Sequence, residues 1–142
     1  MNVWRFAAVF FFSLAGLMIG IGLPPAARAG DTAPRFAQSA ITPAEWEAYL
    51  KEVEAKPSAE IINRPDAPDV VVIAVPAEHA MYYFTQFGPA HPAVIVAQVV
   101  SRDGAVFIRH NGHFAGSETA FASWFLDFTK QVDGLRRSMQ TP

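Results

Sequence analysis

Cysteine is absent from the 142 residues of this chain. The chain therefore has no disulfide, no thiol nucleophile and no cysteine-ligated metal, and it cannot be a lipoprotein anchored through cysteine. Basic residues are also scarce, with 11 Lys and Arg against 13 Asp and Glu. A nucleic-acid-binding protein concentrates positive charge in a patch, and no such patch is present, so we expect no nucleic-acid partner.

The first 29 residues have the three zones of a cleavable signal peptide. Met1 to Arg5 carries one positive charge, and Phe6 to Leu23 is an uncharged apolar run. Ala27-Arg28-Ala29 then offers small residues at the two positions that a signal peptidase reads. We expect export to the periplasm or the medium, with cleavage after Ala29. The alternative is an uncleaved signal, which is the one link to a membrane that the sequence suggests.

Cleavage after Ala29 leaves a chain of one-domain size with nine basic and 13 acidic residues. A chain of this length buries a single hydrophobic core. The small polar residues 30–41 predict a flexible lead-in, and residues 42–142 predict one domain.

A helix is predicted to start at Thr42-Pro43-Ala44-Glu45, which has the residues of a capping box with proline in the first helical turn. Apolar residues then recur along one helical face and predict its buried side: Trp46, Tyr49, Leu50 and Val53. We expect this helix to end by Pro57. A second, C-terminal helix is predicted after Ser117, which can cap it.

Four strands are predicted between the helices, at 70–75, 80–85, 93–101 and 105–110. Residues 58–68 are expected to form a plain connection. Asp103-Gly104 predicts a tight hairpin turn that pairs Ser101 with Val106, Val99 with Ile108 and Ala97 with His110. Asn111-Gly112 predicts another turn. The fold class is therefore α+β, a four-stranded antiparallel meander with an N-terminal and a C-terminal helix packed on one face.

Two histidines flank the predicted Asn111-Gly112 turn. In a two-residue hairpin His110 and His113 would face each other about 5 Å apart and could clip a metal ion. His91, or alternatively His79, would supply a further ligand. The alternative is a pair of partly exposed turn histidines, so no cofactor is expected unless Zn or Cu binds here.

The loop from Phe84 to Ala93 carries Gly88, Pro89 and Pro92 and predicts a stiff connection. Its sequence, Phe84-Thr85 followed by Gly88 and then His91-Pro92-Ala93, resembles a segment of small exported bacterial proteins of unassigned activity. The resemblance covers about ten residues and implies no activity.

The hairpin register also predicts a contact surface on the sheet face opposite the helices. Its residues are apolar apart from one cross-strand polar pair: Val94, Val96, Gln98, Val100, Phe107 and Arg109. We expect this face to bind a protein partner, a small ligand or a second copy of the chain, unless a loop of the same chain covers it.

These features favour an exported binding or envelope-accessory module without catalysis of its own. Two alternatives remain open at this stage. One is a metal-binding protein or metal-assisted hydrolase that uses His110, His113 and His91. The other is a homodimeric structural module.

Overall fold

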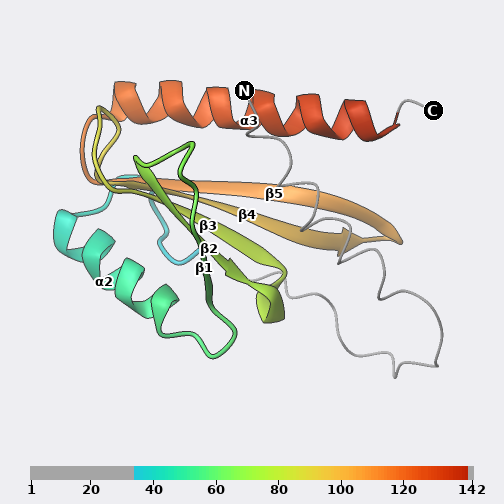
Figure 1. The fold of residues 1–142 in the computed structure, drawn as a ribbon, viewed down its shortest axis with the longest axis horizontal. Coiled ribbons are helices and arrows are strands. Elements are labelled where there is room, and N and C mark those ends of the chain that lie inside the picture. The colour runs from blue at the N-terminus through green and yellow to red at the C-terminus, as the bar shows by residue number, and fades with distance from the viewer. Residues whose placement is uncertain (1–33, 141–142) are drawn as a thin grey trace.

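The computed structural model describes residues 34–140, and the predicted signal peptide lies outside them. One antiparallel sheet lies between two helices (Figure 1). The elements along the chain are α2 (Pro43–Glu54), β1 (Glu60–Ile62), β2 (Val70–Val75), the short 3-10 helix η1 (Pro76–Glu78), β3 (Ala80–Thr85), β4 (Ala93–Arg102), β5 (Ala105–Phe114) and α3 (Glu118–Gln140). The α+β class and the antiparallel sheet with two helices are confirmed.

The sheet has five strands in the order β1-β2-β3-β4-β5, and the prediction of four was wrong. The additional strand, β1, lies inside the segment predicted as a connection and pairs with β2 from Glu60↔Ala74 to Ile62↔Val72. A strand of three residues is too short to show alternation of apolar and polar residues. Its central residue, Ile61, is 64% exposed, so β1 is an edge strand that contributes little to the core.

The local signals at the start of α2 are confirmed. Glu45 N donates to Thr42 Oγ1 at 3.2 Å, and Thr42 N donates to Glu45 Oε2 at 2.7 Å. These reciprocal bonds satisfy backbone donors that a helix start leaves unpaired. The capped helix buries Tyr49 and Val53, which the helical period had assigned to its inner face.

The Asp103-Gly104 hairpin turn is confirmed, with φ of 52° at Asp103 and 78° at Gly104. All three predicted pairs occur, Ser101↔Val106, Val99↔Ile108 and Ala97↔His110. The prediction of a turn at Asn111-Gly112 was wrong, because β5 continues through these residues to Phe114. Asn111 pairs with Val96 and Gly112 pairs with Ile95, so both are ordinary members of the ladder.

The two helices lie on opposite faces of the sheet, and the prediction that both pack on one face was wrong (Figure 1). On the α2 face the helix covers a buried cluster that includes Ile73, Phe84 and Val94. On the other face Phe121 of α3 packs with Ala93 and Ile95. The central strands are apolar on both sides, so each face requires its own cover.

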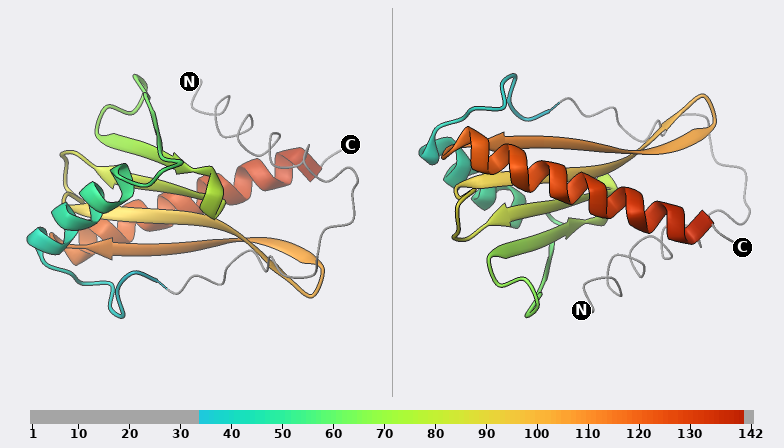
Figure 2. Two further views of the ribbon diagram at one scale, coloured as in Figure 1. Left: turned by 90° about the horizontal axis from the view of Figure 1, so that it is seen from below. Right: turned by 90° about the horizontal axis from the view of Figure 1, so that it is seen from above.

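Helix α3 begins at the end of β5, where Ala120 N donates to Ser117 Oγ at 3.2 Å. It then crosses the sheet diagonally, while the β4–β5 hairpin continues in another direction (Figure 2). The tip of this hairpin, residues 100–107, therefore stands clear of the helix. In the part of the chain that the structure describes, no helix is both long enough and apolar enough to cross a membrane.

Candidate binding site at the open edge of the sheet

The outer edge of β5 is paired over only a small part of its length. Phe114 N donates to Ser39 O and Ile41 N donates to Phe114 O, both at 2.9 Å, in a parallel bridge with the lead-in. Backbone groups alternate in direction along an antiparallel strand, so the N–H and C=O groups of every second residue back to Val106 face the same outer edge. No residue among 34–140 forms a further ladder on this side. Within residues 34–140, the edge from Val106 to Gly112 therefore has no partner strand.

A cavity of about 310 Å³ lies against this edge. The lead-in forms one wall with residues 34 and 36–39, β5 forms the floor with residues 110–113, and α3 forms another wall with Phe121 and Phe125. Polar and apolar atoms line it in similar measure, and Phe36, Phe121 and Phe125 supply its aromatic part. We call it the edge cavity.

Gly112 leaves room for the aromatic wall of the edge cavity. An added Cβ atom at this position would lie 2.9 Å from Cδ2 of Phe125 and would also collide with the Phe121 ring. Phe121 in turn stacks on Phe114 with ring centroids 5.1 Å apart. The glycine thus lets α3 approach β5 closely, and its role is packing rather than turning the chain.

His110 supplies a polar atom at the edge cavity. Its Nε2 atom is buried and has no hydrogen-bond partner among the described residues. Its ring meets Phe128 edge-on with centroids 5.5 Å apart. Burial lowers the pKa of His110 below the usual value, although the nearby Asp133 carboxylate acts in the opposite direction. Burial therefore favours the neutral form of this imidazole.

His113 lies on the opposite face of β5, since it is three residues from His110 on a continuous strand. Its Nδ1 atom is 2.9 Å from Gln38 O, so this nitrogen carries the hydrogen and donates it. Its ring packs edge-on against Phe36, with centroids 5.1 Å apart. Burial lowers the pKa of His113, and the bond to Gln38 O opposes that shift without cancelling it. His113 therefore fastens the lead-in to the sheet.

The predicted metal ligands are not brought together. His110 and His113 leave opposite faces of β5, and His91 lies in the β3–β4 loop. There, His91 Nδ1 is 3.0 Å from Thr85 O, and its ring meets Trp46 edge-on. Across residues 34–140, no three His, Asp or Glu side chains are grouped so that they could hold a metal ion.

The residues of the predicted contact surface divide into two groups. Val94 and Val96 are buried in the core cluster under α2, so the chain itself covers that part of the face. Gln98 is 7% exposed, and its Oε1 accepts a hydrogen bond of 2.8 Å from Arg109 Nη2, as the predicted cross-strand pair requires. Val100 and Phe107 lie beyond the cover of α2, and Phe107 is 49% exposed.

A second, polar cleft of about 120 Å³ lies between α2, the lead-in and the sheet. Glu78 is the centre of its hydrogen bonds, since Lys56 Nζ and Tyr82 Oη both donate to its carboxylate at 2.6 Å. Gln98 Nε2 also donates to the backbone carbonyl of Glu78 at 3.3 Å. Because these groups satisfy one another, the cleft ties α2 to the sheet, and we do not take it as the binding site.

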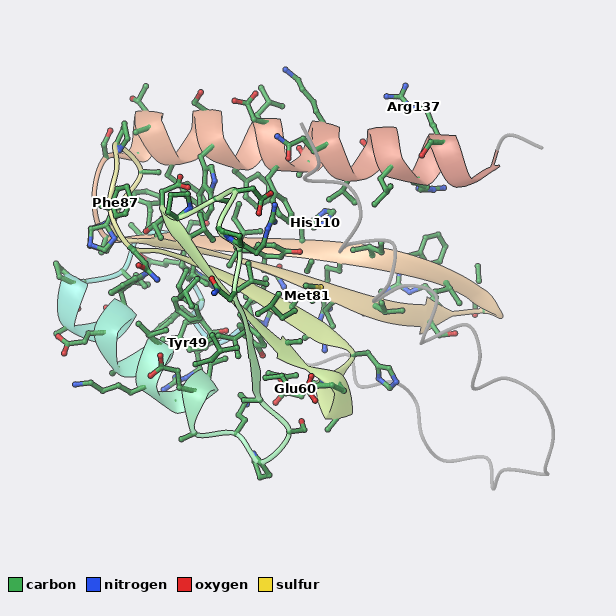
Figure 3. All side chains as sticks on the ribbon, in the orientation of Figure 1. Tyr49, Glu60, Met81, Phe87, His110 and Arg137 are labelled. Atoms are coloured by element: carbon green, nitrogen blue, oxygen red, sulfur yellow. The ribbon has the colours of Figure 1, made fainter. Side chains whose placement is uncertain are left out.

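The sequence reasoning missed the edge cavity. Its floor was assigned to a turn, and its outer wall was assigned to a flexible lead-in. One signal could have shown that the floor is a strand, because Val106, Ile108 and Phe114 are in phase on one face of a single strand. Figure 3 labels His110 in the space between β5 and α3.

Comparison with protein-family models, with curated proteins and with solved structures finds no match to this chain.

Proposed function

We propose that the protein is an exported binding module that acts by holding a partner at the open edge of β5, without catalysis of its own. Export is inferred from the signal-peptide pattern that ends at Ala29. The observation that carries the binding role is the joint presence of an open strand edge and an aromatic cavity beside it. An added strand would use the backbone groups of the edge, and its side chains would enter the cavity.

The composition of the site supports a macromolecular partner over a small polar ligand. Backbone N–H and C=O groups in a row pair best with another extended chain. The walls provided by Phe121 and Phe125 favour an apolar side chain. His110 lines the same cavity and would place its imidazole beside that side chain.

The proposed site is tested by measuring how much of the fluorescent probe anilinonaphthalene sulfonate binds to the protein. The protein is kept at the lowest concentration that gives a measurable signal. We expect one probe to bind in the edge cavity. Ala37 is exposed and lines this cavity, so Ala37→Trp should fill it and abolish most of the fluorescence gain. Ala122→Trp is the control, because Ala122 is exposed on α3 and does not line the cavity. Equal probe binding by both variants and the unmodified protein would refute the proposed site.

A further inference from the structure

The two ends of the β5 edge are complementary to each other. At one end the hairpin tip presents exposed apolar side chains, with Val106 63% and Phe107 49% exposed. At the other end lies the edge cavity, floored by residues 110–113. When two copies of a strand pair antiparallel about a twofold axis, the N-terminal end of each strand lies beside the C-terminal end of the other. The tip of one copy would thus enter the cavity of its partner, twice per dimer.

We propose that the partner held at the β5 edge is a second copy of this chain, paired antiparallel through β5 into a continuous sheet. This inference rests on the proposed function and names the occupant of the same site.

Neither helix covers the hairpin end of the edge, while the lead-in lies beside residues 110–113 at the other end. Helix α3 diverges from the hairpin tip, and α2 lies on the opposite face near the other end of the sheet (Figure 2). The strand Ala105–Phe114 contains no Lys and no Pro, the residues that commonly protect an edge from pairing. The other edge of the sheet is β1, which has only three residues and offers a much shorter ladder.

Backbone direction and charge select the register. In an antiparallel pair, a residue whose backbone N–H and C=O point out of the edge must lie opposite a residue of the same kind. The registers that satisfy this rule and use most of the edge place the twofold axis at Ile108 or at Arg109. An axis at Arg109 would set that residue against the partner's Arg109 at the closest cross-strand spacing, where like charges repel. An axis at Ile108 instead sets Phe107 against the partner's Arg109, a favourable cation–π arrangement. We therefore place the axis at Ile108.

The first test is the mass of the protein in solution, measured by light scattering during size exclusion. We expect a dimer. Val106→Lys should place a charge against the partner's edge cavity and raise the dimer dissociation constant by about tenfold or more. Val106→Pro should act similarly by removing an outward N–H that β4 does not use. Ile61→Lys is the control, because Ile61 is 64% exposed on the β1 edge and should leave the dimer intact.

The second test is disulfide trapping, which is clean because the chain has no other cysteine. Paired residues with outward backbone groups have Cα atoms about 5.5 Å apart, within the range that a disulfide spans. Ile108→Cys should crosslink the dimer on mild oxidation, whereas Arg109→Cys and Ile61→Cys should crosslink much less. Efficient crosslinking through position 109 or 61 would overturn the proposed axis.

The outcomes separate this inference from the proposed function. A protein that stays monomeric at all concentrations overturns self-pairing. Self-pairing is also overturned if Val106→Lys and Val106→Pro both keep the melting temperature of the unmodified protein and both still form the dimer. If the monomer still binds the probe and Ala37→Trp abolishes that binding, the site stands and its occupant is another protein. If neither dimer nor probe binding occurs, both proposals fail.

Discussion

Gly112 lies so close to Phe125 that a Cβ atom on the glycine would be 2.9 Å from Cδ2 of the ring. Gly112→Ala must therefore displace α3 or its aromatic rings, and we expect a loss of about 1–3 kcal/mol of unfolding free energy. Urea denaturation measures this loss. Gly134→Ala is the matched control, because an added Cβ there meets nothing within 4 Å. Inside a helix this second change should raise stability by about 0.5–1 kcal/mol. A neutral result at Gly112 would show that the rings are not tightly packed on it.

Stability should fall as the pH drops below neutrality. The pKa values of His110 and His113 are lowered in the folded protein, in both cases mainly by burial. The unfolded chain therefore takes up protons at a higher pH than the folded one, and stability is lost from about pH 7 downward until both folded imidazoles titrate.

Replacing these two histidines should flatten that pH dependence. The measurement is the urea midpoint between about pH 7 and pH 5 for the protein and for the variant His110→Gln with His113→Gln. An unchanged slope in the double variant would show that other groups cause the acid sensitivity.

The network at Glu78 should stabilise the fold only while its carboxylate is ionised. Burial raises the pKa of Glu78, but hydrogen bonds from Lys56 and Tyr82 outweigh burial and leave the pKa below its usual value. Its contribution is therefore present above the ordinary carboxyl pKa and is lost as the pH falls through the lowered one. Tyr82→Phe should cost about 1–3 kcal/mol at neutral pH and progressively less in acid.

Tyr83→Phe is the control for the Glu78 network. Within the described residues, the Tyr83 hydroxyl donates to the weak acceptor Met81 Sδ at 3.7 Å. Its loss should change the free energy of unfolding by about 0.5 kcal/mol or less. Thermal or urea unfolding at two pH values distinguishes the variants, and equal losses for both would contradict the assigned role of Glu78.

Processing should remove the first 29 residues in an exporting host. The Ala27-Arg28-Ala29 site follows an apolar run broken by two prolines. Mass spectrometry of the purified protein should therefore place its N-terminus at Gly30. Intact protein starting at Met1 and recovered with membranes would contradict cleavage.

The sequence predicted the elements that are fixed by interactions between residues close together in the chain. Thr42 and Glu45 cap α2 through bonds between near neighbours, and Asp103-Gly104 sets the β4–β5 register because its backbone requires positive φ at both residues. Asn111-Gly112 has the same kind of composition but a different cause. Gly112 is there because Phe121 and Phe125 approach it from α3, and a local pattern does not reveal that contact.

The sequence did not indicate on which face of the sheet each helix lies. The apolar residues on both sides of the central strands indicated that both faces are covered, but not which helix covers which face. Likewise, the lead-in gave no apolar period, and its position follows from bonds between Phe114 and residues about 75 positions earlier, Ser39 and Ile41. The edge cavity is formed by three such distant segments, so the sequence could indicate its strand floor but not the assembly of its walls.

Pro34, the first described residue, lines the edge cavity, whereas α3 runs diagonally across the sheet away from β5 (Figure 2). The placement of a purification tag therefore matters for every measurement above. A tag fused directly to Pro34 would begin at the edge cavity and compete with whatever binds there. A tag after α3 would leave that edge accessible, so C-terminally tagged protein should report its association faithfully.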